Sequence, residues 1–465
     1  MVRDFSLSVN QTMQVSHAIF KAYDIRGLVG SEITPQVAYH LGRAYATFLR
    51  EGNADAPLRV VVGYDMRVSS EDLKGELTRG LMESGADVLD IGLVSTPVFY
   101  FSVGHLHAQG GIIITASHNP ATYNGFKCTR EQAIPVGGDS GFARLIEIIE
   151  SERYNAGEGK VEEIPNMTQL AVESHKNFAG QGEVRPMKIV VDSGNGMGAQ
   201  YMDVLFSLLP VEAVRLYWDL DGSFPHHESN PIKKETLKDL QAKVIAEKAD
   251  VGIATDGDGD RIFFVDDAGK IVEPAIIRGL LSQVMLRRFP GAVICYDVRP
   301  GKITEDMILE SGGKPSRTRV GHSLIKAQMR RDGAVFGGES SGHFFYNFPT
   351  GTYDGPLTAI VQILQEITRT GKSFSEMTAP LYRYEQSGEI NYQVIEKEAA
   401  LTRLKTHFAD GQQDTQDGLS VTYPTFWFNV RPSNTESLLR LNLEAVDRAT
   451  MEAKRDEVSA IIEQS

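Results

Sequence analysis

One unit of sequence occurs three times and constrains the fold of this chain more than any other feature. Each copy is an apolar, mostly β-branched run that leads into an aspartate and then into a turn containing glycine or arginine. The copies are RVVVGYDMRVSS, which ends at residue 70, KIVVDSGNGMGA, which ends at 199, and AVICYDVRPGK, which ends at 302. Their aspartates stand at positions 65, 192 and 297, intervals far longer than the period of about 20 to 50 residues typical of repeat arrays. We therefore expect each run to be a buried strand that enters a loop, in three similar α/β domains.

The segments around these strands predict further elements. Thr34 can cap a helix that begins at Pro35, carries apolar residues on one face and stops at Glu51-Gly52. The last part of the chain has an α+β pattern, and Asp417-Gly418 in it fits a turn between strands. Its strand candidates are 388–394, 420–430 and 438–445, and its helix candidates are 396–408 and 449–462. A fourth, smaller domain is expected there.

The length of the chain supports this division. Its 465 residues exceed the roughly 250 to 300 residues that one hydrophobic core supports. We expect a loose N-terminal tail followed by four domains. The tail is placed at 1–17 and the domains at 18–157, 158–262, 263–382 and 383–465.

Composition excludes several classes of protein. The two cysteines, Cys128 and Cys295, lie too far apart in the sequence for a disulfide framework or a zinc site, which favours a reducing compartment. No apolar run approaches the roughly 20 residues that span a bilayer, and the N-terminus lacks a signal-peptide core, so we expect a cytoplasmic protein with no membrane partner. The formal net charge of −14 disfavours nucleic acid as a partner, although a local cluster of basic residues can still bind a small anion.

The motif GGIIITASHNPATYNGFK places a serine at the end of a predicted strand. Ser117 and His118 follow the apolar run and precede the turn Asn119-Pro120. A serine on a loop held by a sheet can act as a nucleophile when a neighbouring group activates it. The G-x-S-x-G elbow of acyl-transfer hydrolases is absent. Taken alone, a serine that caps a turn is the more common explanation.

The motif TDGDGDR lies between two apolar runs and predicts a metal site. Asp256, Asp258 and Asp260 alternate along an extended loop, so their carboxylates project to the same side, and the glycines let the backbone bend around a cation. Oxygen ligands select magnesium or calcium. The glycine and glutamate that an EF-hand requires are absent, and a solvated acidic turn is the other alternative. Arg261, directly after the carboxylates, suits the neutralisation of a transferring phosphoryl group.

Two further motifs predict binding loops. GGESSGH carries short donors and acceptors that suit sugar hydroxyls, and RPSNTE offers an arginine fork and a polar turn that suit an anion. The residues are Glu339, Ser340, Ser341 and His343 in the first motif, and Arg431, Ser433, Asn434 and Thr435 in the second. Considered alone, the first is more simply a surface turn, and the second is equally well a polar hairpin.

Together and in this order, the four motifs resemble those of the α-D-phosphohexomutases, and in particular the phosphomannomutase/phosphoglucomutase branch. The resemblance extends from Phe20 to the last helix candidate and depends above all on TASHNP and DGDGDR. It implies three similar α/β domains with mixed sheets and a C-terminal α+β domain like the TATA-binding protein, arranged as a heart round a central cleft. The implied enzyme is an intramolecular phosphotransferase, which is an isomerase.

The resemblance also implies roles for individual residues. The implied catalytic residues are Ser117 as the phosphoserine, Lys127, Arg26, Arg261 and His322. The implied ligands of Mg²⁺ are Ser117, through its phosphoryl group, and Asp256, Asp258 and Asp260. The implied substrate-binding residues are Glu339 and Ser341 for sugar hydroxyls, Arg431, Ser433, Asn434 and Thr435 for the phosphate that does not react, Arg299 and, by a looser match, Tyr23 and His343. We favour Lys127 or His322 for proton transfer, which requires a group within about 3 Å of the sugar oxygen.

The implied chemistry is reversible phosphoryl transfer between the 1- and 6-positions of hexose phosphates, with glucose or mannose 1,6-bisphosphate as intermediate and activator. FKAYDIRG and the threonine of TASHNP favour mannose and glucose, because glucosamine-phosphate mutases usually carry a GTDGIRG-like run and SASHNP. Ser340 stands where methionine or glutamine is common, and Arg299 where lysine is usual. The alternatives are a phosphoglucosamine mutase, a phosphatase and a non-catalytic sugar-phosphate or metal-binding protein. A monomer or a dimer is expected.

Overall fold

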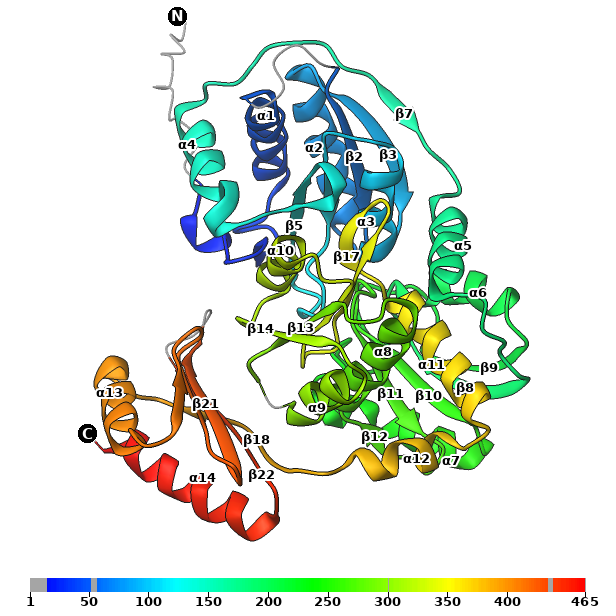
Figure 1. The fold of residues 1–465 in the computed structure, drawn as a ribbon. Helices are drawn as coiled ribbons and strands as arrows, with labels where there is room; N and C mark the ends of the chain where they lie inside the picture. The colour runs from blue at the N-terminus through cyan, green and yellow to red at the C-terminus, as the bar shows by residue number, and fades with distance from the viewer. Residues whose placement is uncertain (1–14, 52–56, 300, 434–437, 465) are drawn as a thin grey trace, which may run out of the picture.

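The chain forms three α/β domains in succession and a smaller C-terminal domain, which lies beside the third domain in Figure 1. The structure is a computed structural model that describes residues 15–51, 57–299, 301–433 and 438–464. In Figure 1 the first domain is blue to cyan, the third is mostly yellow and light green, and the C-terminal domain is orange to red.

The first domain has a mixed sheet with helices packed against it. The strands lie in the order β1 (Ile25–Leu28), β5 (Tyr123–Arg130), β4 (Gly110–Ile114), β2 (Arg59–Tyr64), β3 (Asp87–Leu93) and β7 (Val161–Glu163), and β6 (Pro135–Val136) pairs with β5. The helices are α1 (Pro35–Glu51), α2 (Ser70–Glu83), α3 (Thr96–His105) and α4 (Ala143–Ser151). The helix predicted from Pro35 to Glu51 is confirmed as α1, whose apolar face is buried because it packs on the sheet.

The second domain repeats this arrangement. Its strands lie in the order β12 (Ile271–Val272), β11 (Ile262–Asp266), β10 (Val251–Thr255), β8 (Met187–Asp192) and β9 (Val211–Leu216). Its helices are α5 (Met167–Ala179), α6 (Gly198–Ser207) and α7 (Lys238–Glu247).

The third domain repeats it again. Its strands lie in the order β14 (Lys314–Thr318), β13 (Val293–Asp297), β15 (Phe336–Gly338), β16 (Phe344–Phe348) and β17 (Gly351–Asp354). Its helices are α8 (Pro274–Arg288), α9 (Lys302–Glu310), α10 (His322–Asp332), α11 (Pro356–Thr370) and α12 (Phe374–Thr378).

The three repeated sequence units occupy equivalent strands. They form β2, β8 and β13, each of which has a parallel neighbour on both sides. One of these neighbours then pairs with an antiparallel strand in all three domains. The prediction of three similar α/β domains with mixed sheets is therefore confirmed.

Three predicted positions differ from the structure. The first sheet continues to β7 and the second to β12, so the predicted boundaries at 157 and 262 fall before the last strand of each sheet. The boundary at 262 was placed too early, because the aspartate motif is a loop that connects two paired strands of the second sheet. The tail predicted at 1–17 extends too far towards the first domain, because Val15 is buried in the core of that domain. Residues 1–14 lie outside the described residues.

The C-terminal domain is an antiparallel sheet with two helices. Its strands lie in the order β18 (Glu385–Tyr392), β22 (Leu439–Ala445), β21 (Phe426–Pro432), β20 (Leu419–Thr422) and β19 (Gln412–Asp414), and its helices are α13 (Lys397–His407) and α14 (Arg448–Glu463). The prediction of one strand over 420–430 is wrong. Pro424 has no N–H to donate to a ladder, and the chain turns there between β20 and β21. The predicted turn at Asp417-Gly418 is confirmed between β19 and β20, with φ of +70° at Gly418.

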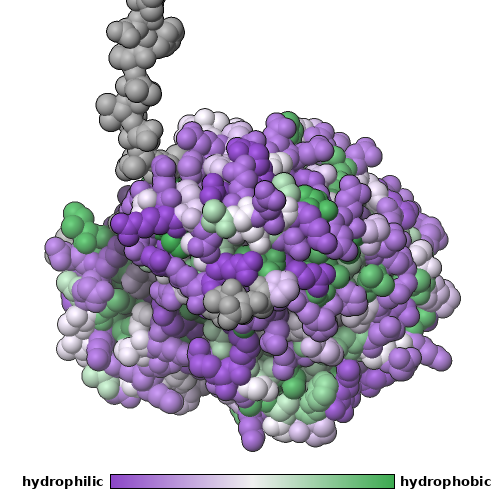
Figure 2. Space-filling view, turned by 90° about the horizontal axis from the view of Figure 1, so that it is seen from above, coloured by the Kyte–Doolittle hydropathy of each residue, from purple (hydrophilic) through white to green (hydrophobic). Residues whose placement is uncertain are grey.

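The surface is mostly polar. Figure 2 shows the face seen from above as predominantly hydrophilic, with hydrophobic residues scattered over it rather than gathered in one large patch. None of the helices in the described parts of the chain combines the length and the apolar character that crossing a membrane requires.

Candidate active site

Three loops at equivalent positions carry the predicted chemistry. In each of the first three domains a buried strand ends in a loop that returns as its antiparallel neighbour, from β4 to β5, from β10 to β11 and from β15 to β16. We name them the serine loop (115–122), the aspartate loop (256–261) and the hydroxyl loop (339–343). Because the same edge of each sheet carries its loop, one site can combine side chains from all three domains.

Ser117 directs its hydroxyl from the serine loop at the aspartate loop. Its Oγ donates to Asp256 Oδ2 at 2.9 Å and lies 3.1 Å from His118 Nδ1. Its φ of +49° belongs to the left-handed region, where residues other than glycine are uncommon and which is enriched at functional sites. The N–H of Ser117 donates to Thr115 Oγ1 at 2.9 Å and so supports this conformation.

Arg67, which was not predicted as a site residue, holds the serine loop in place. Its guanidinium is buried and pairs with Asp65 at 3.3 Å. It donates to four carbonyl oxygens, those of Ser117 at 2.8 Å, Asn119 at 2.6 Å, Pro120 at 2.9 Å and Tyr123 at 2.9 Å. The Asp-x-Arg pattern that the first and third repeated units share, in YDMR and YDVR, is the signal that could have identified it.

The aspartate loop gathers three buried carboxylates. Oxygens of Asp256, Asp258 and Asp260 lie within 4.8 Å of one another, as a metal ion requires. Burial, together with the charges of Asp258 and Asp260, raises the pKa of Asp256 to about 7. Among the described residues, Asp258 Oδ1 and Asp260 Oδ1 are buried with no hydrogen-bond partner. A set of oxygen donors with unsatisfied atoms fits a hard divalent cation such as Mg²⁺.

Lys127 and Thr96 fix the aspartate loop against the first domain. Lys127 Nζ donates to Asp258 Oδ2 and Asp260 Oδ2, each at 2.6 Å, and Thr96 Oγ1 donates to Asp258 Oδ2 at 2.7 Å. Burial disfavours the charge of Lys127, but the two carboxylates outweigh it and raise the pKa of Lys127 well above its ordinary value. Lys127 is therefore protonated in this arrangement. Thr96, the first residue of α3, was not predicted.

A chain of polar contacts joins the aspartate loop to the third domain. Arg261 Nε donates to His343 Nε2 at 3.0 Å, and His343 Nδ1 lies 2.8 Å from Asp354 Oδ1. Asp354 in turn accepts from the buried Lys326 at 3.1 Å. Because Arg261 donates to Nε2, the ring proton of a neutral His343 is on Nδ1. These contacts place Arg261 beside the carboxylates, 3.9 Å from Asp256 Oδ2.

The hydroxyl loop presents Glu339 and Ser341 beside Arg299. Glu339 Oε1 accepts from Arg299 Nη2 at 3.0 Å, and a hydrogen bond of 2.9 Å from Glu339 N to His343 O closes the loop. The hydroxyl of Ser341 is buried and has no hydrogen-bond partner among the described residues. Glu339 and Ser341 therefore stand on one short loop, and their role in binding hydroxyls stays a prediction.

The N-terminal site residues reach the same region. Arg26 donates to Asn119 Oδ1 of the serine loop at 2.7 Å. Tyr23 donates to the carbonyl of Val320 at 3.0 Å, and its ring lies 5.2 Å from the ring of His322. Burial, and then the positive charge of Lys326, lowers the pKa of His322 well below its ordinary value. The ring of His322 is therefore neutral at neutral pH.

The motif predicted to bind phosphate lies in the C-terminal domain. Arg431 is buried on β21 and lies 3.6 Å from Glu389 of the same domain. Burial, and then the positive charge of Arg299, lowers the pKa of Arg431. The guanidinium groups of Arg299, in the third domain, and Arg431, in the C-terminal domain, are therefore near each other. Ser433 follows β21, whereas Asn434 and Thr435 lie outside the described residues.

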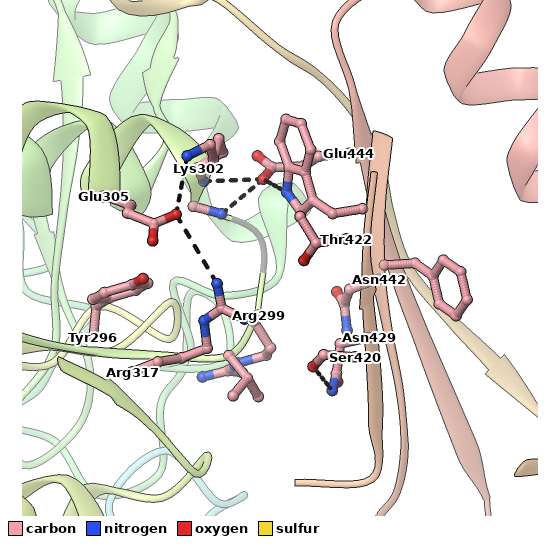
Figure 3. A pocket seen from close by; sticks show the side chains of 14 residues that line it. Tyr296, Arg299, Lys302, Glu305, Arg317, Ser420, Thr422, Asn429, Asn442 and Glu444 are labelled. Atoms are coloured by element: carbon pink, nitrogen blue, oxygen red, sulfur yellow. Dashed lines mark hydrogen bonds and ion pairs between the residues drawn. The ribbon is translucent and has the colours of Figure 1, made fainter. Parts of the chain in front are cut away.

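A pocket separates the third domain from the C-terminal sheet (Figure 3). Arg299 and Arg317 line one side of it, and Ser420, Asn429 and Asn442 line the other. Arg299 thus lies at the boundary between the hydroxyl loop and the C-terminal domain.

Comparison with known proteins places this arrangement in a family. The sequence matches the four phosphoglucomutase/phosphomannomutase family models: alpha/beta/alpha domain I over residues 17–156, domain II over 169–269, domain III over 274–384 and the C-terminal domain over 389–461. The chain belongs to the phosphoglucomutase/phosphomannomutase family. It is therefore a phosphohexomutase, and the predicted family and enzyme class are confirmed.

Individual relatives agree with the family. The chain is 38% identical over 449 residues to "Phosphohexose mutases" of Xanthomonas campestris pv. campestris (strain B100), with 95% of this chain and 98% of that protein covered. It is 37% identical over 456 residues to a "Phosphomannomutase" of Escherichia coli, with the same coverage of both chains. The crystal structure of a phosphoglucomutase/phosphomannomutase family protein from Burkholderia thailandensis matches with a TM-score of 0.88 and 34% identity over 97% of this chain and 98% of that one.

Proposed function

We propose that this phosphohexomutase transfers a phosphoryl group reversibly between the 1- and 6-positions of mannose and/or glucose phosphates, with Ser117 as the phosphate carrier and a hexose 1,6-bisphosphate as the intermediate. The observation that carries the proposal is the approach of Ser117 Oγ to Asp256 Oδ2 at 2.9 Å across two domains. A serine in a strained, clamped loop beside three carboxylates suits a phosphate that is received and returned repeatedly.

Asp256, Asp258 and Asp260 would hold the Mg²⁺ ion together with an oxygen of the Ser117 phosphoryl group. When bound, the ion would neutralise charge on the transferring group. The unsatisfied oxygens of Asp258 and Asp260 support this assignment. Arg261, fixed by His343, would add a second positive charge at the same place.

The two ends of the sugar phosphate need different contacts. Glu339 and Ser341 would hold ring hydroxyls, and Arg299 would orient Glu339. The phosphate that does not react would bind Arg431, Ser433, Asn434 and Thr435. After the first transfer the bisphosphate turns round, and the same loops bind it in the opposite direction while Ser117 takes back the other phosphoryl group.

Proton transfer has two candidate groups. In the forward step the sugar hydroxyl attacks the phosphorus, the bond from phosphorus to Ser117 Oγ breaks, and the hydroxyl proton must leave. We favour Lys127 or His322 as the group that transfers it, because the described residues place the Lys127 side chain against the aspartate loop and the ring of His322 beside that of His343.

Mannose and glucose phosphates are the proposed substrates. The relatives named above are a phosphomannomutase and phosphohexose mutases, which agrees with the preference that FKAYDIRG and TASHNP indicate. A phosphoglucosamine mutase is not favoured by these likenesses.

Coupled assays on mannose, glucose and glucosamine 1-phosphates test the proposal. We expect turnover of the first two, with a higher kcat/KM than for glucosamine 1-phosphate. The Ser117→Ala variant should fold and be inactive. A preference for glucosamine 1-phosphate, phosphate release as fast as isomerisation, or a fully active Ser117→Ala variant would contradict it.

A further inference from the structure

Asp297 connects the two positions at which this sequence departs from the phosphohexomutase pattern. Its Oδ2 accepts from Arg299 Nε at 2.7 Å and from the backbone N–H of Ser340 at 3.2 Å. Its Oδ1 accepts from Ser340 Oγ at 2.9 Å. Arg299 and Ser340 therefore share one buried carboxylate at the end of β13. Ser340 uses its hydroxyl inside the protein, although its two neighbours in the hydroxyl loop are assigned to the sugar.

Arg278 of α8 completes this cluster and has no part in the site described so far. Its side chain is fully buried, and its Nη1 donates to Asp297 Oδ1 at 2.7 Å and to Ser340 Oγ at 3.3 Å. Its Nε donates to Thr304 Oγ1 at 3.0 Å. A buried arginine with this many directed hydrogen bonds has one orientation available to it.

Two glycines lie so close to the Arg278 side chain that no larger residue fits in their places. A Cβ atom at Gly338, the residue before the hydroxyl loop, would lie 2.8 Å from Arg278 Cδ. A Cβ atom at Gly301, the residue before α9, would lie 2.1 Å from Arg278 Nη2. Arg278 thus fits between two glycines, Gly301 and Gly338, and Gly338 leads directly into Glu339.

We propose that Arg278 is a positioning residue for sugar recognition: through Asp297 it fixes Arg299 and the backbone of Ser340, and so sets the place of Glu339. This inference rests on the proposed function of the hydroxyl loop. Two cations, Arg278 and Arg299, alternate with two anions, Asp297 and Glu339, so the loss of Arg278 leaves Asp297 with fewer partners in a buried place. Arg299 then shifts towards Asp297 and away from Glu339, and Glu339 loses its orientation.

The role predicts a specific change in substrate discrimination. An enzyme that hydrogen-bonds a hydroxyl rejects the analogue that lacks it, and this rejection depends on the orientation of the protein group. We expect the Arg278→Met variant to have a raised KM for glucose 1-phosphate and a smaller penalty for at least one of the 2-, 3- and 4-deoxy analogues. The ratio of kcat/KM between parent and analogue should fall by about tenfold, the effect of one hydrogen bond. Arg278→Lys, which keeps the charge, should recover part of this ratio.

The experiment measures kcat and KM for glucose 1-phosphate and the three deoxy analogues in the whole enzyme. The variants are Arg278→Met, Arg278→Lys and Ser340→Ala, and the matched control is Arg287→Met on the same helix, whose arginine pairs with Glu366 outside the site. If Arg278→Met does not fold, the double-mutant cycle of Arg278→Lys and Ser340→Ala replaces it, and non-additive effects on the ratio are expected.

Three results are possible and each is decisive. A reduced ratio in the Arg278 variants but not in the control supports the inference. Equal losses for the parent sugar and all analogues, or additive effects in the cycle, would overturn it, because a purely structural residue lowers the amount of active enzyme without changing the ratio. A wild-type enzyme that turns over none of the hexose phosphates would instead contradict the proposed function.

Discussion

One hydrophobic cluster spans the first three domains, in addition to the clusters within each of them, whereas the cluster of the C-terminal domain lies within that domain. The shared cluster contains Val61 of the first domain, Ile189 of the second and Phe336 of the third. The cluster of the C-terminal domain is confined to residues between Tyr392 and Ile462. The junction between the third and C-terminal domains is polar instead. Glu444 accepts from the N–H groups of Gly301 and Lys302 at the start of α9, each at 3.0 Å (Figure 3).

This difference matches the two tasks of the enzyme. In the proposed mechanism Ser117, the three aspartates and Arg261 would act on the phosphoryl group that moves, and transfer requires fixed distances between them. They lie on the domains with a common core. Arg431 and Ser433 would bind the phosphate that does not move, at either end of the sugar, and they lie on the domain with a separate core. A polar junction can adjust to both orientations of the substrate at a smaller cost than a packed core.

Asp258 tests the first three domains, which a common hydrophobic cluster joins, and its replacement should have a greater effect than the changes below. Replacement of Asp258 by Asn removes one negative charge from the proposed metal site and leaves Lys127 and Thr96 with a weaker acceptor. We expect kcat to fall by about 1,000-fold or more, with little change in KM, because the lost interaction acts on the transferring group. Steady-state assays with and without EDTA and Mg²⁺ check this, with Asp239→Asn, a surface carboxylate bonded to Tyr217, as control. Activity that survives both EDTA and the substitution would refute the metal site.

Arg67 tests whether the hydrogen bonds that hold the serine loop are needed for activity. Its replacement by Met removes four hydrogen bonds and leaves Asp65 buried without its cation, a change that costs about 3 to 5 kcal/mol of unfolding free energy in comparable pairs. We expect kcat to fall by about 100-fold, as a small displacement of a reacting group does. Urea unfolding and steady-state kinetics measure the two effects. The control is Arg79→Met on the surface of α2; equal behaviour of the two variants would show that the clamp has no function.

His175 tests the junction of the first three domains. It lies on α5 among Phe101 of the first domain and Phe348 of the third, and burial lowers its pKa to about 3. The unfolded chain binds a proton at this histidine below about pH 6.5 while the folded chain does not, so its contribution to the free energy of unfolding is lost as pH falls from about 6.5 towards 3, at up to about 1.4 kcal/mol per pH unit.

The measurement is urea unfolding as a function of pH. Between pH 6.5 and pH 4.5 the free energy of unfolding should depend less steeply on pH in His175→Phe than in the wild type, by the equivalent of up to one bound proton. Between pH 7 and pH 8 the pH dependence of the two proteins should be the same. Identical slopes at acidic pH would contradict the assignment of a neutral, buried ring.

The smallest effect is expected at the junction with the C-terminal domain. In Glu444→Gln one carboxylate oxygen becomes an NH₂ group, and the remaining carbonyl oxygen accepts from the N–H groups at the start of α9 without a negative charge. We expect KM to rise about threefold to tenfold and kcat to change little, since the hydrogen bonds at this junction are weakened but keep an acceptor. The control is Glu452→Gln, at a partly exposed residue of α14 that pairs with Arg448. A large fall in kcat would mean that the C-terminal domain takes part in the transfer step itself.

Much of this organisation could be predicted from the sequence because it depends on local patterns. The runs that end in Asp65, Asp192 and Asp297 are β-branched and bounded by turns, so they identify strands and three similar domains. Ser117 and the aspartates stand in motifs that few other structures require. In both cases the residues that carry the signal are neighbours in sequence.

The remainder depends on contacts between distant segments. Arg278 bonds to groups far away in the chain, and nothing around it in sequence marks it as buried. Arg67 also bonds to distant carbonyl groups, and only its local pair with Asp65 leaves a signal in the sequence. The end of the second domain was misplaced because the aspartate loop joins two strands of one sheet. A boundary drawn directly after the motif separates these two strands. The break at Pro424 was missed because the apolar residues on both sides continue the strand pattern.

Intact-mass spectrometry of the purified enzyme shows whether Ser117 carries the phosphate. After incubation with glucose 1,6-bisphosphate, we expect a species heavier by about 80 Da, the mass of one added phosphoryl group, on Ser117. This species should be absent from Ser117→Ala, and addition of a hexose monophosphate should remove it from the wild-type enzyme. An unmodified wild-type enzyme that nevertheless turns over its substrate, or an equal mass increase in Ser117→Ala, would contradict the role of Ser117 as the phosphate carrier.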